Sequence, residues 1–348
     1  MKRSALGLAG ALAGLGMLTA CGTSTSPAPS VASTSPASAG AASASLTPFK
    51  VQLGFIANTQ NYAIPHGIAD GAYAKAGLQV SFAPGGIGVD PIKVVASGQA
   101  QVGIANGESL VAAEGTGLKL KVLGAEFGIS PLGMLCRDDA NVSTLKDITG
   151  KKIGVRPISS PGFPTLLKSN GISPSSVTVV NVSNTDEANL IAGHIDCEYA
   201  DLALNEPRIV ANAGVPNHIL LDADYGQGAQ ENVYFTTASY YAAHQDLLKS
   251  WIQATQAEWK GFLANPIAGS EWILSHDSSE GLNPAQEKAQ ATAMVPFIST
   301  KFTKDHGLLA LNPALWQESA QTAYAAGTTK TLVDTSVMLT SLVDPAIS

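Results

Sequence analysis

The sequence predicts an α/β protein in which short apolar strands alternate with helices, followed by a helical region at the C-terminal end. Three observations support this fold class. Strand-like apolar runs recur from residue 49 onward, the helical stretches between them close at glycines such as Gly77 and Gly98, and Asn-Pro pairs typical of helix starts recur after residue 264. Strands separated by helices form β-α-β units, so we expect mixed, mostly parallel sheets flanked by helices.

The first part of the body alternates regularly between strand and helix patterns. Residues 51–55 and 78–82 alternate as strands, and residues 64–76 between them read as a helix closed by Gly77. After the glycine-rich loop 84–89, Asp90 and Pro91 are typical of a helix N-cap and first turn. Residues 101–105 are expected to form the next strand.

A weak internal repeat is visible further along the chain. Residues 94–104 and 189–199 both run helix, glycine, strand, and their glycines, Gly98 and Gly193, are 95 positions apart. Asp186 precedes the second helix much as Asp90 precedes the first, so we interpret Asp186 as an N-cap. Either the repeat reflects the helix-glycine-strand order common to all α/β proteins, or it indicates two similar lobes.

Strands are also expected at residues 131–136, 152–155 and 218–221, before the pattern turns helical after Asn232. The apolar positions of the following segment share one helix face: Leu248, Trp251, Ile252, Thr255, Trp259 and Phe262. Three Asn-Pro pairs are interpreted as helix starts, at residues 265–266, 283–284 and 312–313.

The first 48 residues indicate export and anchoring. Lys2 and Arg3 precede an apolar run, and Leu-Thr-Ala stands directly before Cys21, which resembles the lipobox of bacterial lipoproteins. The resemblance implies a signal peptide over residues 1–21 and a lipid on the Cys21 thiol; an ordinary cleaved signal is the alternative. Residues 22–48, almost entirely Ser, Thr, Ala, Pro and Gly, are expected to be a disordered tether.

Composition excludes some classes of partner. The chain has 14% charged residues and a net charge of −7, which becomes −9 without Lys2 and Arg3, so we expect no nucleic-acid partner. Apart from Cys21, the cysteines are Cys136 and Cys197; export permits a disulfide, but unpaired apolar cysteines fit equally well.

Motifs of catalysis are absent from the sequence. There is no His-Glu-x-x-His, P-loop, Gly-x-Ser-x-Gly or Cys-x-x-Cys, and the six histidines include no i, i+4 histidine pair that would hold a metal. We therefore expect no enzyme activity, no metal and no cofactor.

Several motifs, in their order along the chain, resemble the solute-binding proteins of ABC importers for nitrate, sulfonates, taurine and thiamine-pyrimidine precursors. They are residues 58–62, 74–80, 85–91, 95–104, 130–133, 145–155 and 205–207. The Ser-Pro and Asn-Glu-Pro elements favour the pyrimidine-precursor branch. The resemblance implies a two-lobed periplasmic-binding-protein fold, type II-like, with lobe I at 49–130 plus 231–348 and lobe II at 131–230. The chain would cross between lobes near 126–131 and 230–234.

Because ligands of open α/β sheets bind beyond the carboxyl ends of strands, we expect the binding residues in the loops that follow them. In lobe I they are Asn58, Gln60, Asn61, Tyr62, Gly86, Gly88, Asn106 and Glu108. In lobe II they are Ser159, Ser160, Phe163, Tyr199, Asp201 and Glu206, although Glu206 fits a surface turn equally well.

The charge of these loops predicts the ligand class. Arg156 is the basic residue closest to the expected cleft, and Glu108, Glu126, Asp201 and Glu206 outnumber it. We therefore expect a neutral or cationic polar heterocycle, stacked on Tyr62 or Tyr199, delivered to an ABC permease and its ATPase by a lipid-anchored extracytoplasmic monomer. The alternatives are a small anion such as nitrate, a sulfonate or taurine, a pyrimidine-synthesis-like enzyme on the same fold, and an adhesin or scaffold.

Overall fold

The computed structural model describes residues 45–346 except 87, 157–161, 183–186 and 277–280. The expected signal peptide with Cys21, most of the expected tether, and the candidates Ser159, Ser160 and Asp186 lie outside the described residues. Thr47 and Pro48 were expected in the tether but begin the first strand, because Thr47 already pairs with Leu78 of the neighbouring strand.

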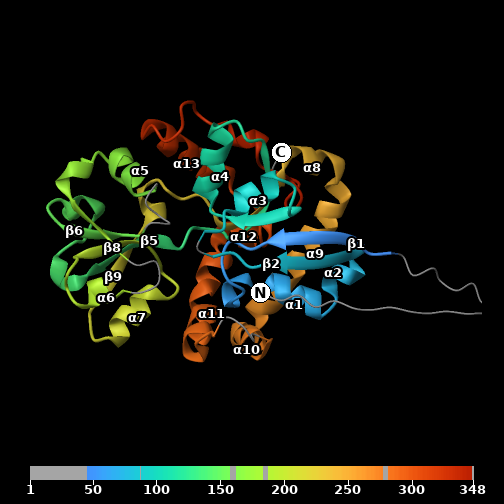
Figure 1. Cartoon of the computed structure of the whole chain (residues 1–348), viewed down its shortest axis with the longest axis horizontal. Helices are drawn as coiled ribbons and strands as arrows, with labels where there is room; N and C mark the ends of the chain where they lie inside the picture. The colour runs from blue at the N-terminus through green and yellow to red at the C-terminus, as the bar shows by residue number, and fades with distance from the viewer. Residues whose placement is uncertain (1–44, 87, 157–161, 183–186, 277–280, 347–348) are drawn as a thin grey trace, which may run out of the picture. The chain divides into compact units, whose positions relative to one another are not determined.

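Two five-stranded sheets, each flanked by helices, form the framework of the described chain (Figure 1). The first sheet has the order β2-β1-β3-β10-β4, with bounds Leu78–Ala83, Thr47–Gln52, Val102–Ala105, Glu231–Thr237 and Leu120–Phe127. The second has the order β7-β6-β8-β5-β9, with bounds Thr178–Asn181, Lys152–Val155, Cys197–Leu202, Leu132–Arg137 and Asn217–Leu221. The α/β fold class predicted from the sequence is confirmed.

Both sheets repeat one topology. In each sheet, the first three strands of the order are parallel to one another. The fourth strand, β10 in the first sheet and β5 in the second, runs antiparallel to both of its neighbours. Parallel pairings are therefore fewer than the sequence suggested. The β-α-β pattern governs only the strands joined by helices, whereas β10 and β5 follow a connection between the sheets and enter in the opposite direction.

The internal repeat predicted from the sequence has a counterpart in hydrogen bonding. Gly98 and Gly193, both with φ near +75°, lead into β3 and β8. Three residues after each glycine, Gln101 and Asp196 accept a hydrogen bond through their side chains from the backbone N of Lys50 and Lys152, at 2.7 Å in both cases. Their own backbone N–H groups donate to the same two lysines' carbonyls. The segments leading into β3 and β8 are thus bonded to β1 and β6 in the same way in the two sheets.

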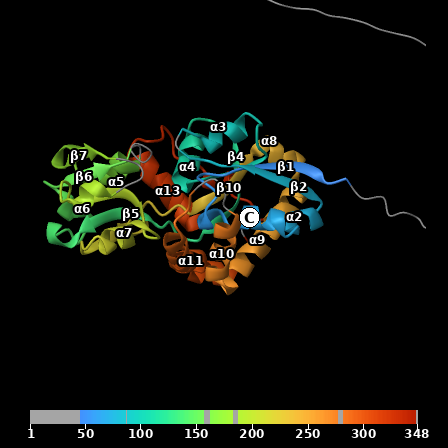
Figure 2. The same cartoon turned by 60° about the horizontal axis from the view of Figure 1, so that its bottom comes forward.

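The helices around the first sheet come from both ends of the chain (Figures 1 and 2). They are α1 (Ala63–Ala69), α2 (Ala72–Lys75), α3 (Pro91–Ala96), α4 (Gly107–Gly115), α8 (Ala238–Ala243), α9 (Gln245–Ala264), α10 (Pro266–His276), α11 (Pro284–Ile298), α12 (Lys301–His306) and α13 (Pro313–Ala325). Those of the second sheet are α5 (Gly162–Ser169), α6 (Ala188–Ile191) and α7 (Glu206–Asn212). The helix predicted over 64–76 is two helices, because Gly71 adopts φ +79° between them.

The core lies mainly between the first sheet and the C-terminal helices. All six residues of the predicted apolar face of α9, from Leu248 to Phe262, are buried, and Asn283 and Asn312 cap α11 and α13 as expected. Trp251, Trp259 and Trp316 are fully buried. In the described part of the chain, no helix combines the length and apolarity needed to cross a membrane.

Cys136 and Cys197 form a disulfide across neighbouring strands. They are directly paired residues of β5 and β8, with Cα atoms 4.1 Å apart and both side chains fully buried. The alternative of two unpaired cysteines, which the sequence left open, is not what the structure shows. A disulfide fits an oxidising compartment outside the cytoplasm.

Candidate functional site

The loop after β1 is held together by its own amide side chains. Asn58 is the N-cap of the 3₁₀ helix η1 (Thr59–Asn61), and its Oδ1 accepts hydrogen bonds from Gln60 N (3.2 Å) and Asn61 Nδ2 (3.3 Å). Asn61 Nδ2 also donates to the Ile56 carbonyl at 2.9 Å. Gln60 Oε1 accepts from Gln290 Nε2 of α11. All three expected site residues are buried here, and these hydrogen bonds fix the loop's shape.

Tyr62 lies in an aromatic cluster rather than at an open surface. Its ring stacks on His66, with centroids 4.6 Å apart, and contacts Phe262 and Trp272. Burial raises the pKa of Tyr62 to about 12. The exposed aromatic ring beyond β1 is Phe55, which is 44% exposed and was not singled out from the sequence. Its place at the carboxyl end of the strand expected over 51–55, where ligands of α/β sheets bind, was the sequence signal that could have found it.

The glycine-rich loop after β2 packs tightly against the loop after β1. A Cβ on Gly85 would lie 2.5 Å from both the Gly54 C and Leu53 O atoms, so only glycine fits there. Gly85 N donates to the Phe55 carbonyl at 2.9 Å, which joins the two loops. The expected site residues Gly86 and Gly88 follow with φ of +128° and +86°. Gly85 therefore lies beside Phe55, and Gly86 and Gly88 follow it beyond the carboxyl end of β2.

The start of α4 follows the carboxyl end of β3. Asn106 is its N-cap residue, exposed and without a side-chain capping bond, and Glu108 is in its first turn. Between them, Gly107 N donates to the Gln230 carbonyl at 3.2 Å, and a Cβ at Gly107 would lie 2.6 Å from that oxygen. Gly107 thus lets the chain returning from the second sheet pack against the N-terminal end of α4.

A buried ion-pair cluster lies at the carboxyl edge of the second sheet. Arg156, directly after β6, places its Nε 2.8 Å from Glu198 Oε1 and its Nη2 3.0 Å from Glu187 Oε1. Its Nη1 lies 3.8 Å from Oε1 of Glu206, the first residue of α7. The guanidinium and the Glu198 and Glu187 side chains are 8% exposed or less. One positive charge therefore faces three carboxylates, so Arg156 is engaged by its own protein.

Two further expected site residues of this sheet pack against each other. Phe163 of α5 and Tyr199 of β8 have ring centroids 5.1 Å apart, and each is 3% exposed. The Tyr199 hydroxyl donates to Gln227 Oε1 at 3.3 Å. Asp201 belongs to β8, where it pairs with Gly133; its side chain lies outside the described part of the structure.

The structure brings Glu108 of α4 and Tyr199 of β8 into one group of buried titratable side chains. Asp222 begins the 3₁₀ helix η6 (Asp222–Tyr225) and interacts electrostatically with the Tyr199 hydroxyl, while Glu231 begins β10 and interacts electrostatically with Glu108. Asp222 and Glu231 are each 4% exposed. No local sequence pattern pointed to Asp222 or Glu231, because they are far from the other members along the chain.

Burial changes the protonation of this group. It raises the pKa of Asp222 to about 7 and of Glu108 to about 8, and it raises the pKa of Glu231 well above its ordinary value. The Asp222 charge contributes further to the raised pKa of Glu108. Burial likewise raises the pKa of the Tyr199 hydroxyl. Asp222, Glu108 and Glu231, at the connection between the sheets, therefore hold their protons more tightly than exposed carboxyl groups do.

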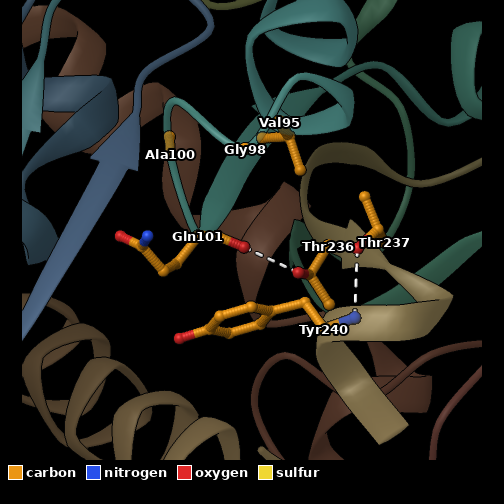
Figure 3. Close-up of a pocket in the computed structure, with 7 residues that line it drawn as sticks. All are labelled: Val95, Gly98, Ala100, Gln101, Thr236, Thr237 and Tyr240. Atoms are coloured by element: carbon orange, nitrogen blue, oxygen red, sulfur yellow. Dashed lines mark hydrogen bonds between the residues drawn. The ribbon is translucent and has the colours of Figure 1, made fainter. Parts of the chain in front are cut away.

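A small pocket lies elsewhere, at the amino end of β3 (Figure 3). It is lined by Val95, Gly98, Ala100, Gln101, Thr236, Thr237 and Tyr240, and has a volume of about 70 Å³. Thr236 Oγ1 donates to the Gln101 carbonyl at 2.6 Å across it. Ligand sites usually measure roughly 300 Å³ or more, so this pocket is not the candidate site.

Comparison with known proteins identifies the family. The family model described as "NMT1/THI5 like" matches residues 58–268, well over half of the chain. The chain belongs to the NMT1/THI5-like family. The chain is also similar to the riboflavin-binding protein RibY of Chloroflexus aurantiacus, with 24% identity over 91% of this chain and 92% of RibY.

Solved structures show the fold of this family member. The periplasmic aliphatic sulphonate binding protein SsuA of Escherichia coli aligns with a TM-score of 0.63 at 14% identity, over 85% of this chain and 98% of SsuA. The alkanesulfonate-binding protein SsuA of Xanthomonas axonopodis pv. citri, bound to MOPS, aligns at 0.59 with 17% identity, over 84% and 98%. The desulfurization enzyme DSZB aligns less well, at 0.52 with 15% identity, over 83% and 94%. The expected periplasmic-binding-protein fold is confirmed, and family and fold together support a solute-binding protein of the ABC-importer type.

Proposed function

We propose that the protein is an extracytoplasmic solute-binding lipoprotein that delivers a small polar heterocycle, neutral or cationic, to an ABC importer. The ligand would lie between the carboxyl ends of the strands of the two sheets, with residues 49–130 plus 231–348 as one lobe and 131–230 as the other. Ligand binding would draw the lobes together around it, and the permease would recognise the liganded form.

The observation that carries the ligand class is the engagement of Arg156. An anion site requires cationic or N–H donors directed at the ligand. Arg156, the basic residue that the sequence placed nearest the site, instead pairs with Glu198 and Glu187 and lies close to Glu206. The Glu108, Asp222 and Glu231 carboxyl groups at the connection between the sheets, whose pKa values burial raises, add hydrogen-bonding groups there and no positive charge. A ligand with hydrogen-bond donors or a positive charge fits this environment better than nitrate or a sulfonate.

The relatives agree with this proposal in part. RibY, which covers nearly the whole chain, is named for binding riboflavin, a heteroaromatic compound. The SsuA proteins are named for binding sulfonates, but their identity of 14–17% supports the fold and not the ligand. A heterocycle such as a thiamine-pyrimidine precursor is therefore the proposed ligand class, and small anions are the alternative that a binding assay must separate.

Phe55 and Asn106 are the side chains best suited to test the site. Both are exposed, so truncation should leave the fold intact. If Phe55 stacks on the heterocycle, Phe55→Ala should weaken affinity roughly 2- to 10-fold. Tyr324→Ala, a 50% exposed aromatic on α13, is the matched control and should bind normally. Equal affinity in Phe55→Ala, Asn106→Ala and the control would show that the loops after β1 and β3 do not contact the ligand.

The ligand itself can be sought by mass spectrometry of compounds released when the purified protein is denatured. Release of a heteroaromatic compound supports the proposal. A ligand-dependent rise in melting temperature would separate a binder from a scaffold, and unchanged ligand after prolonged incubation would separate it from an enzyme. Lipid anchoring predicts that Cys21→Ser moves the protein from the membrane fraction to the soluble fraction.

A further inference from the structure

Three potential metal ligands meet between α1 and α9, away from the strand ends. His66 lies on α1, Asp70 is the residue that ends this helix, and Glu258 lies on α9. One ligand atom from each lies within 4.8 Å of the other two, and His66 Nδ1 is 2.5 Å from Glu258 Oε2. His66 is not recognisable as a ligand from the sequence, because its partner Glu258 is 192 positions away and only the fold brings them together.

The scaffold holds these side chains in position. His66 and Asp70 are four residues apart and so share one face of the helix. Gly67 allows Glu258 to approach, because a Cβ there would lie 3.0 Å from Glu258 Cγ. One turn earlier on α9, Thr255 Oγ1 hydrogen-bonds to the Tyr73 hydroxyl at 3.0 Å. Tyr73 lies on α2 and its hydroxyl also donates to the Ala63 carbonyl of α1 at 3.2 Å, so Tyr73 joins α1 to α9 independently of His66.

The imidazole ring of His66 is also oriented by its neighbours. Tyr62 stacks on it with centroids 4.6 Å apart, and Trp272 meets it edge-on at 4.8 Å. The His66 side chain is 24% exposed, the Glu258 side chain 7%, and Asp70 is exposed. The group is therefore preorganised on one side and open to solvent on the other, so an ion could enter.

We propose that His66, Asp70 and Glu258 bind a divalent transition metal ion of the Zn²⁺ type, with water as the fourth ligand. One imidazole and two carboxylates suit Zn²⁺ and its neighbours, whereas Ca²⁺ and Mg²⁺ require a larger set of oxygen ligands. Tetrahedral coordination at about 2.0–2.1 Å places ligand atoms roughly 3.3 Å apart. The His66–Glu258 contact must open slightly, and any separation near the 4.8 Å limit must close by up to about 1.5 Å, a movement that rotation of the exposed Asp70 carboxylate would supply.

Two other histidine–carboxylate contacts provide an internal comparison. His218 Nδ1 lies 2.7 Å from Asp138 Oδ1, and His306 Nδ1 lies 2.7 Å from Asp344 Oδ2. Within the part of the chain that the structure describes, neither pair belongs to a group of three such ligands, whereas His66 does. Two-ligand pairs of this kind should bind metal only weakly, so they serve as controls on the same molecule.

The test is a calorimetric titration of the full chain, first freed of metal by a chelator, with ZnCl₂ and separately with CoCl₂. We expect one saturable site and a visible absorption band of tetrahedral Co²⁺. His66→Gln and Glu258→Gln should abolish both signals. Asp70→Asn should lower affinity at least about tenfold, since even second-shell partners of metal ligands contribute 10- to 100-fold. His306→Gln should bind as the unaltered protein does.

Asp70→Asn keeps the test decisive if the buried variants fold poorly, because Asp70 is exposed. Thermal unfolding without metal will establish that this variant is folded. Absence of a saturable site in the unaltered protein would overturn the proposal. So would Zn²⁺ affinity in folded Asp70→Asn equal to that of the unaltered protein, or a loss of affinity in His306→Gln as large as in Asp70→Asn.

Discussion

Replacing Asp222 with asparagine should stabilise the protein at alkaline pH and leave it unchanged at acid pH. Asp222 is 4% exposed and interacts electrostatically with the Tyr199 hydroxyl. Desolvation by burial raises its pKa from 3.8 to about 7. The folded protein therefore holds the proton on Asp222 more tightly than the unfolded chain does.

The sign and the size follow from proton linkage. The favourable contribution of protonated Asp222 is fully present below about pH 4 and is lost as the pH rises through about 7. A pKa difference of about 3, at 1.36 kcal/mol for each pKa unit, corresponds to about 4 kcal/mol at pH 8. Because Glu108 and Glu231 can take up a proton in its place, this value is an upper bound. An asparagine keeps the shape, carries no charge and can donate to those carboxylates.

The assay is urea unfolding at pH 4 and pH 8 of the unaltered chain and the Asp222→Asn variant. We expect the variant to be about 2–4 kcal/mol more stable at pH 8 and equal at pH 4. Asp224→Asn, an exposed aspartate on the same short helix, is the control and should show no such pH dependence. The reasoning is refuted if Asp222→Asn destabilises the protein at pH 8, or if its effect is the same at both pH values.

Three further changes test the framework. Gln230→Ala should lower the free energy of unfolding in urea by about 3 kcal/mol. The Gln230 side chain is fully buried, donates to the Ala310 carbonyl and accepts from Asn312 N and Trp316 Nε1. A loss below about 0.5 kcal/mol would contradict this anchoring role. Reducing the Cys136–Cys197 disulfide, which spans 61 positions, should lower the free energy of unfolding by about 4 kcal/mol. If Cys136 and Cys197 are both free thiols in the unfolded, unreduced protein, the disulfide does not exist. Gly85→Ala should weaken ligand binding by displacing the loop beside Phe55, whereas Gly261→Ala on α9, with no atom within 4 Å of the added Cβ, should bind normally in the same titration.

The sequence predicted those features that are encoded locally. Periodicity located the strands and the apolar face of α9, and Asn-Pro pairs located the starts of α11 and α13. The repeated helix-glycine-strand segment pointed to the shared topology of the two sheets, whose third strands follow Gly98 and Gly193. Each of these patterns involves only residues close together in the sequence, so it can be recognised before any tertiary structure is known.

Features formed by distant residues were not predictable. Asp222 and Glu231 join Glu108 only because the chain returns from the second sheet past Gly107. The pairing of Arg156 with Glu187 and Glu198 likewise depends on β6 and β8 being neighbours. Tyr62 reads as a candidate stacking residue in the sequence, yet its ring packs on Phe262, 200 positions later. Long-range packing decides which of several polar or aromatic residues face a ligand.

The most direct test of the proposed function is calorimetric titration of the protein with a panel of heterocycles, including riboflavin and a thiamine-pyrimidine precursor, beside taurine, an alkanesulfonate and nitrate. The engagement of Arg156 by carboxylates predicts one-to-one binding of a heterocycle and no measurable heat with the anions. Tight binding of taurine, a sulfonate or nitrate, with the heterocycles silent, would contradict the account.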